Sequence, residues 1–483
     1  MAHGWRQFLV LEAVPGEAHE PTSRAAKHPG LTWHDHLVML LHVAAEIEHG
    51  LMVQYLYAAY SLGGPDAQTP ERHAIIKRWQ TSILKVAKEE MGHLLTVQNI
   101  LCLLGAPAHF GREDYPWSVP YYPYPFRLEK LTRSSLACYV HAEMPPHITA
   151  MLKKYPELSR RLKDFTDTDK AEIARLIKAR ASGPVHTVAA IYDEIVDIIR
   201  NEHLIPDSAF DEESYGYQAS WDDWGRGYGP EPRLLDPSGS APDDPQRQRE
   251  ANVIIMRAAT RTEALAALKA IGSQGEAIHL APKRTDELSH FERFLKIFQE
   301  FPDDWAPARD IPDNPTTRKF DSKDAAYIDN DTARDWGTLF NYRYRLLLTC
   351  LTHSFRLARL AQAGEPNLRG MVMHRVFGEM YNIKTIAGII VGLELHRPGT
   401  PAKGPQFAGP PFEMSYSLTL PDTEADAWRV HREFLQGSME VGKLLLEKAT
   451  GAGRDYLLAL KTLDLQAIAS IDALLAGQGS KRK

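Results

Sequence analysis

The chain has 483 residues, and its 56 Lys and Arg against 62 Asp and Glu give a formal net charge of −6. That weak acidity argues against a nucleic-acid-binding protein that relies on a basic surface. Hydrophobic residues make up 44% and charged residues 24%, as in an ordinary globular protein, and the length allows one to three domains. Its three cysteines are far apart and form no CxxC pair, which disfavours a disulfide scaffold and a cysteine-based zinc finger.

We expect neither a targeting segment nor a membrane segment in this sequence. Residues 1–14 lack the apolar stretch of a signal peptide. The apolar run 386–393 is far shorter than the ~20 residues of a membrane span. We therefore expect a cytoplasmic protein with neither a membrane nor a nucleic acid as partner.

Two long amphipathic helices are predicted in the first quarter of the chain. Apolar residues recur at steps of three and four over 37–62 and again over 83–104. The triplets Gly63-Gly64-Pro65 and Gly105-Ala106-Pro107 are expected to end them. Clean strand alternation is absent, so the predicted fold class is all-α. Shorter helices are predicted at 131–144, 185–200, 262–271, 285–301, 336–360, 371–393 and 423–449.

Three stretches rich in Pro, Gly and Asp are predicted to be connectors: 206–249, 302–323 and 396–411. They predict a helical bundle over 31–305, with 206–249 as a long loop insertion, and a C-terminal helical region over 333–476 that packs on the bundle. A loop of about forty residues is either a solvated insertion or a functional lid.

Glu48 and Glu90 interrupt the apolar stripes of the two long helices. A carboxylate in a core is costly unless it is paired or bound to a metal. Glu90 also begins an E-x-x-H pair with His93, and this spacing places both side chains on one helical face. A second E-x-x-H pair is formed by Glu287 and His290.

Dimetal carboxylate bundles take one Glu from each of two helices and a Glu-x-x-His pair from each of the other two. A single E-x-x-H pair is weak support, because 46–49 and 276–279 match the same spacing, and a structural ion pair is the alternative. We choose Glu143 as the remaining ligand, with Asp193 and Glu194 as alternatives, while Glu46 competes with Glu48. The predicted metal ligands are Glu48, Glu90, His93, Glu143, Glu287 and His290.

Several segments, in this order, resemble one known family. They include Ala45-Glu-Ile-Glu-His49, Glu89-Glu-Met-Gly-His93, Leu104-Gly-Ala-Pro107, Ala142-Glu-Met-Pro145 and Gln274-Gly-Glu276. The sequence resembles the ferritin-like domain of iminophenyl-pyruvate dimer synthases, which serve bisindole pathways such as violacein, and of the related chromopyrrolate synthases. The resemblance implies a ferritin-like four-helix bundle with additional C-terminal helices. It also implies a non-haem iron site at Glu48, Glu90, His93, Glu143 and His290.

The chain departs from this pattern at two places. Some ferritin-like relatives carry a Glu in the segment that matches Val188 to Tyr192, which here reads Val-Ala-Ala-Ile-Tyr, so Glu143 must take that role. Glu287 lies close to Pro282, which places it near the start of its helix and makes Glu276 the alternative ligand.

Other residues near the predicted site allow two interpretations each. Tyr55, Tyr57, Tyr60, Tyr139 and Tyr192 either line a substrate site or form an aromatic core with capped hydroxyls. His42 and His49 share a stripe with Glu46, which is an alternative metal face or a set of structural histidines. Cys350 and His353 show no base partner in the sequence, which disfavours a cysteine nucleophile.

The leading functional prediction is an oxidoreductase with two metal ions, expected to be iron, that uses dioxygen or peroxide. The expected substrate is a small organic molecule such as an imino or keto acid, and a homo-oligomer is compatible with the sequence. The alternative is a helical bundle that binds metal without turning over an organic substrate, for iron handling or as a scaffold.

Overall fold

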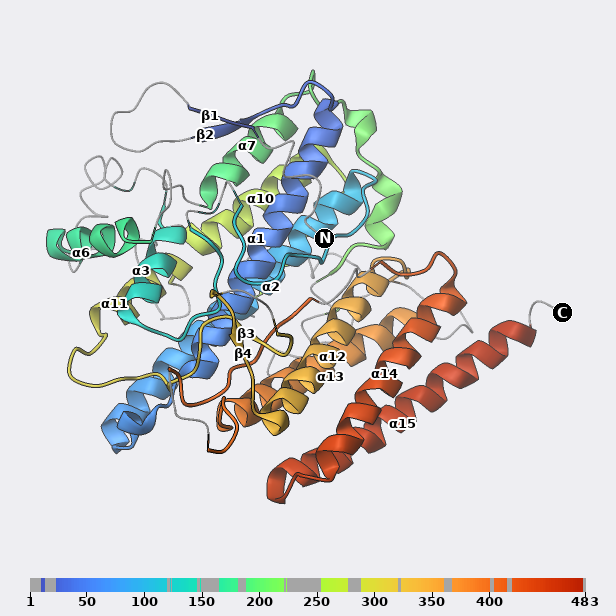
Figure 1. The fold of residues 1–483 in the computed structure, drawn as a ribbon. Coiled ribbons are helices and arrows are strands. Elements are labelled where there is room, and N and C mark those ends of the chain that lie inside the picture. Colours follow the sequence, from blue (N-terminus) through green and yellow to red (C-terminus); the bar gives the residue numbers. More distant parts are fainter. Residues whose placement is uncertain are drawn as a thin grey trace. The chain divides into compact units, whose positions relative to one another are not determined.

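The structure is a computed structural model, and its chain divides into two compact units (Figure 1). The first unit comprises Met1–His109 and Pro116–Ala308, and the second comprises Phe110–Tyr115 and Arg309–Lys483. The predicted boundaries of 31–305 and 333–476 stay predictions. The structure describes residues 10–13, 23–119, 122, 124–145, 148, 165–180, 188–220, 223, 253–276, 288–319, 323–359, 367–399, 404–414 and 419–480.

The all-α prediction is confirmed. Strands in the described ranges are limited to an antiparallel pair, β1 (Val10–Ala13) with β2 (Ser23–Ala26), and a parallel pair of two residues each, β3 (Pro315–Thr316) with β4 (Ala326–Tyr327). Short 3-10 helices cover Pro65–Ala67, Asp207–Ala209 and Glu212–Gly216.

The two long helices of the first unit pack against each other. Helix α1 (Trp33–Ser61) begins at a capping box between Thr32 and Asp35, and α2 (Pro70–Leu103) begins after Thr69 with a proline in its first turn. Gly63 and Gly105 follow their ends with φ of 97° and 69°, a left-handed conformation in which glycine meets no Cβ strain. The predicted ends of both helices are therefore correct, although α2 begins earlier than its apolar stripe.

Helix α1 is rich in apolar residues. Among the described helices it is long and apolar enough to cross a membrane. However, 89% of its apolar window is buried inside the structure, as expected of a core helix. It packs against α2 and α7.

The rest of the bundle consists of shorter helices: α3 (Arg133–Ala142), α6 (Asp167–Lys178), α7 (Ala189–Arg200), α10 (Arg261–Glu276) and α11 (His290–Gln299). Helix α7 packs on α1 and α10, whereas α3 packs on α11, and both α10 and α11 contact α2. A backbone hydrogen bond of 3.5 Å from Val188 N to Ala142 O joins the end of α3 to the start of α7. The helices that pack on α1 and α2 are therefore short: α3 and α10 end, and α7 and α11 begin, within the bundle rather than at its ends.

The described residues of the second unit include four longer helices: α12 (Asp331–Ser354), α13 (Leu368–Ile390), α14 (Glu424–Leu446) and α15 (Gly451–Ser480). Helix α12 packs on α13 and α14, and α14 packs on α15 (Figure 1). The fully buried Arg343 of α12 is paired with Glu379 of α13 and Asp464 of α15. This network ties three of the four helices together.

The segment around 253–256 lies against one face of α2. The amide of buried Asn99 donates to Ala219 O and Met256 O, both at 2.8 Å, and accepts from Ala219 N at 2.7 Å. Gly92 allows this close approach, because a Cβ added there would lie 2.5 Å from Ile254 O. The absence of a side chain at Gly92 therefore lets the segment lie directly on α2 between Glu90 and His93.

We expect Gly92→Ala to lower the free energy of unfolding by about 2 kcal/mol, because its methyl group overlaps a backbone oxygen that cannot rotate away. The matched control is Gly272→Ala in α10, where an added Cβ meets nothing within 4 Å. That variant is expected to gain about 0.5–1 kcal/mol from helix propensity. Urea unfolding followed by circular dichroism measures both, and equal effects would contradict the packing argument.

Candidate metal centre

The long helices place buried carboxylates at the centre of the first unit. Glu48 on α1 is 3% exposed, while Glu90 and His93 on α2 are 1% and 4% exposed. The i, i+3 spacing brings Glu90 Oε2 within 3.0 Å of His93 Nδ1, as the sequence predicts. Helical periodicity therefore sets the Glu90–His93 pair, and the packing of α1 on α2 adds Glu48 to the same wall.

The opposite wall comes from the interruption of the shorter helices. Glu143 is the residue that caps the C-terminus of α3, and His290 is the first residue of α11, after the N-cap Ser289. Gly275, next to the end of α10, lies beside both, because a Cβ added there would be 3.4 Å from Glu143 Oε2 and 3.9 Å from His290 Nδ1. Helix ends, rather than helix middles, thus supply this side of the site.

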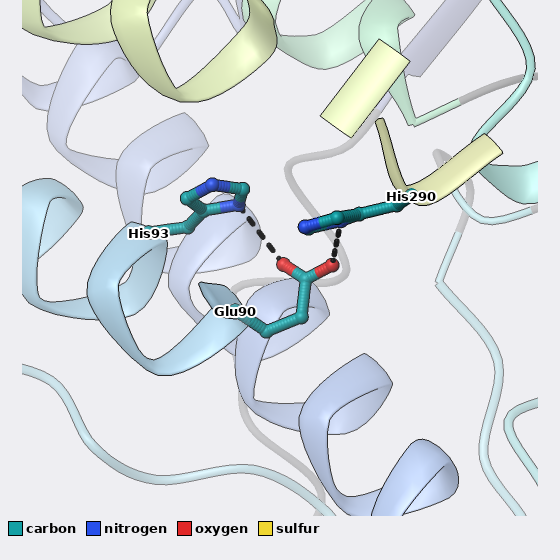
Figure 2. A group of neighbouring side chains, drawn as sticks. All are labelled: Glu90, His93 and His290. Carbon is teal, nitrogen blue, oxygen red and sulfur yellow. Dashed lines mark hydrogen bonds and ion pairs between the residues drawn. The ribbon is translucent and has the colours of Figure 1, made fainter. Parts of the chain in front are cut away.

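Glu90 lies between the two imidazole rings (Figure 2). Its Oε1 is 2.8 Å from His290 Nδ1, and its Oε2 is 3.0 Å from His93 Nδ1. The rings of His93 and His290 are stacked with their centroids 5.3 Å apart. These three residues form a group whose ligand atoms all lie within 4.8 Å of one another.

Each imidazole also faces an outer carboxylate. Glu48 Oε2 lies 3.7 Å from His93 Nδ1, and Glu143 Oε2 lies 3.5 Å from His290 Nδ1. The site therefore has two similar halves, each with one imidazole and one outer carboxylate, and Glu90 contributes one oxygen to each half.

A second layer of hydrogen bonds orients both imidazoles. His290 Nε2 lies 3.0 Å from Glu89 Oε2, and His93 Nε2 lies 3.0 Å from Gln274 Oε1. Because a carboxylate only accepts, His290 Nε2 must donate, which directs Nδ1 of His290 toward Glu90. Arg293 in turn binds Glu89 at 2.9 Å. Outer partners of this kind fix the tautomer of a metal-binding histidine.

Two tyrosine hydroxyls bind the outer carboxylates. Tyr55 donates to Glu143 Oε1 at 2.5 Å, and Tyr192 donates to Glu48 Oε1. Burial and the charges of Glu143 and Glu90 raise the pKa of Tyr55 well above its usual value, so its hydroxyl keeps its proton. Tyr55 also contacts the rings of Tyr139 and Phe294, which form an apolar wall beside Glu143.

The electrostatics of this site favour cations. Burial lowers the pKa of His93, but the charge of Glu90 and the interactions with Glu48 and Glu90 outweigh it and raise the pKa to about 10. Burial, and then the charge of Glu90, raise the pKa of Glu48 to about 7. Glu48 Oε2 is also buried without a hydrogen-bond partner among the described residues. Without a metal, protons on His93 and Glu48 therefore reduce the net negative charge of the site.

This donor set fits metal ions. Three carboxylates and two imidazole nitrogens converge, and a carboxylate with an oxygen toward each half is suited to a pair of ions. The missing Cβ of Gly275 leaves one side of Glu143 and His290 open. Within the described ranges, the ion pairs of Glu48, Glu90 and Glu143 are made with His93 and His290 rather than with Lys or Arg.

The structure brings together five of the six predicted ligands, and Glu287 lies outside the described residues. The helix predicted from 285 begins only at His290, because Ser289 and Glu292 form its capping box. The i, i+3 argument that paired Glu287 with His290 therefore does not apply. Glu276, the alternative to Glu287 as a ligand, is the last residue of α10, and its side chain is not among those that the structure describes.

The competing carboxylates lie elsewhere. Glu194 is 3.6 Å from His36, and Glu46 is 3.0 Å from His109. Sequence reasoning missed the roles of Glu89, Gln274 and Arg293. Glu89 and Gln274 belong to segments that carry the family resemblance. Glu89 is the sequence neighbour of Glu90, and Gln274 lies two residues before Glu276, so their positions in the sequence indicate a place near the site.

A family model described as Ferritin-like matches residues 41–299. The chain is 25% identical over 426 residues to dichlorochromopyrrolate synthase of Lentzea aerocolonigenes, covering 82% of this chain and 37% of that protein. It is 29% identical over 174 residues to 2-imino-3-(indol-3-yl)propanoate dimerase of Chromobacterium violaceum, covering 30% of this chain and 17% of that protein. These relatives confirm the resemblance inferred from the sequence, and the chain spans well under half of their lengths.

A solved ferritin-like protein from Caulobacter vibrioides also aligns with the chain. The alignment has a TM-score of 0.40 and 17% identity, and it covers 72% of this chain and 95% of that one.

We expect Glu143→Ala to weaken metal binding by more than about tenfold, since even outer-layer partners of a metal site change affinity by about 10–100-fold. Glu194→Ala is the matched control, because Glu194 is equally buried but faces His36. Elemental analysis after growth with added iron measures the metal content, and circular dichroism checks the fold. Loss of metal in Glu194→Ala alone would contradict the assignment of Glu143.

Proposed function

The chain belongs to the ferritin-like family, and we propose that it is a metal-dependent enzyme that acts on a small organic substrate. The observation that carries the proposal is the position of Glu90, with one carboxylate oxygen toward each imidazole. We further propose that the ligands of the metal pair are Glu48, Glu90, His93, Glu143 and His290, together with Glu287, and that the metal is iron.

The similarity to two named relatives supports the choice of substrate. One is named a dichlorochromopyrrolate synthase and the other a 2-imino-3-(indol-3-yl)propanoate dimerase. We propose that this chain oxidises an imino or keto acid, and that dioxygen or peroxide accepts the electrons and protons that the substrate loses. A bound iron pair would supply the redox chemistry of such a step.

The residues of the chain orient and shield the site. The Nε2 contacts of His93 and His290 with Gln274 and Glu89 direct both Nδ1 atoms toward Glu90. The Tyr55 and Tyr192 hydroxyls donate hydrogen bonds to the outer carboxylates and so hold them in place. The rings of Tyr55, Tyr139 and Phe294 exclude water from the side of Glu143.

One observation favours the second candidate, a bundle that binds metal without organic turnover. The site residues are almost fully buried, with His290 at 0% and Glu143 at 5% exposed. A closed site suits iron handling, whereas an organic substrate needs an opening beside the metals. The two candidates differ in whether an organic product forms.

We expect the iron-loaded protein to convert indole-3-pyruvate with ammonium, the source of the imino acid, into an oxidised product when hydrogen peroxide or air is present. Mass spectrometry detects the product. Metal-free protein and Glu90→Gln should form none, because the carboxylate shared by both halves is lost.

The matched control is Glu46→Gln, since Glu46 is as buried as Glu90 but contacts His109. This variant should keep both metal and activity. Iron uptake and oxidation by the wild type without any organic product would favour the second candidate. A folded protein that binds no metal would overturn both.

A further inference from the structure

A cavity of about 310 Å³ lies between α14 and α15 in the second unit. Small-molecule sites span roughly 300–1,000 Å³, so this one suits a small ligand. Its walls include Leu446, Leu457 and Leu460, and these leucines offer an apolar surface to the body of a ligand. The cavity is separate from the metal centre, whose residues all belong to the first unit.

Two buried hydrogen-bonding groups line the cavity without partners. Arg343 is 0% exposed, and its terminal nitrogens bind Glu379 and Asp464, with Nη1 3.2 Å from Glu379 Oε1 and 2.9 Å from Asp464 Oδ1. Its Nε, and the Oγ of Ser438, are buried with no hydrogen-bond partner in the described part of the chain. Leaving a buried donor unpaired is costly, so both groups favour an acceptor oxygen from a ligand.

The charges around the cavity favour an anion. Arg343 and Arg375 are balanced by Glu379 and Asp464, which leaves the buried floor close to neutral. The exposed rim carries two lysines, Lys443 and Lys461, against the single carboxylate of Glu440. The rim is therefore net positive.

We propose that this cavity binds a small organic carboxylate with an apolar body. The carboxylate lies at the two rim lysines, where it remains partly hydrated. The alkyl or aryl body packs against the leucines. A hydroxyl or carbonyl oxygen at the far end accepts hydrogen bonds from the two unpaired donors, Arg343 Nε and Ser438 Oγ.

Titration calorimetry of the full chain with 4-phenylbutanoate tests the charge requirement. We expect 4-phenylbutan-1-ol, which has the same body without the charge, to bind the wild type at least about fivefold more weakly than 4-phenylbutanoate does. We expect a similar loss of affinity for 4-phenylbutanoate in the double variant Lys443→Gln, Lys461→Gln. Absence of binding to the wild type at about 10 mM would overturn the proposal. Equal affinity for the acid and the alcohol would also overturn it.

Gly442→Leu tests the location. Gly442 lines the cavity, and a Cβ added there meets nothing within 4 Å, so a new side chain can start there without a clash and occupy cavity space. We expect it to weaken binding of 4-phenylbutanoate at least about tenfold while the protein stays folded. The matched control is Gly378→Leu on α13, where an added Cβ is equally unobstructed and the cavity is not touched. Unchanged binding in Gly442→Leu would place the ligand elsewhere and overturn the proposal.

Ser438→Ala tests the inner end of the cavity. The wild type is expected to bind 4-(4-hydroxyphenyl)butanoate about threefold to tenfold more tightly than 4-phenylbutanoate, because the phenol oxygen reaches the unpaired donors. The alanine variant should reduce this preference while it retains affinity for 4-phenylbutanoate. A preference unchanged by the substitution would contradict the role of Ser438.

Discussion

The structure of the first unit depends on the burial of Glu90 between two imidazoles. A carboxylate that is 1% exposed is tolerable only with compensating charge, and here His93 and His290 lie at 3.0 and 2.8 Å from its two oxygens. The outer carboxylates Glu48 and Glu143 add negative charge that two imidazoles do not balance. The remaining charge must be neutralised by protons or by metal ions, which is the physical basis of the proposed metal centre.

The interruption of the bundle explains how one site draws on so many segments. Helices α3 and α10 end, and α7 and α11 begin, beside the middles of α1 and α2. Glu143, Gln274 and His290 all come from such ends, and Tyr192 comes from the first turn of α7. Helix ends allow side chains to approach from directions that a continuous helix does not offer.

The second unit manages buried charge in a different way. Arg343 lies against Glu379 and Asp464 with Arg375 nearby, so protein cations balance protein anions. In the first unit the buried carboxylates are Glu48, Glu89, Glu90 and Glu143. Among their described ion pairs, only that of Glu89 is made with an arginine, Arg293, and the other three carboxylates pair with histidines. Arginines thus neutralise the buried carboxylates of the second unit, whereas Glu48, Glu90 and Glu143 of the proposed metal centre have only histidines as described ion-pair partners.

The sequence by itself determined the all-α class, the ends of α1 and α2, and the common face of Glu90 and His93, because helical periodicity and glycine-proline stops act over a few residues. Tertiary structure separates Glu143 from Glu194. Both lie on apolar stretches, and only packing places the first beside His290 and the second beside His36. It also moved the start of α11 to His290, because a capping box rather than the apolar pattern sets that boundary. Contacts between distant segments depend on where helices end and how they pack, and the spacing of residues along the sequence does not determine either.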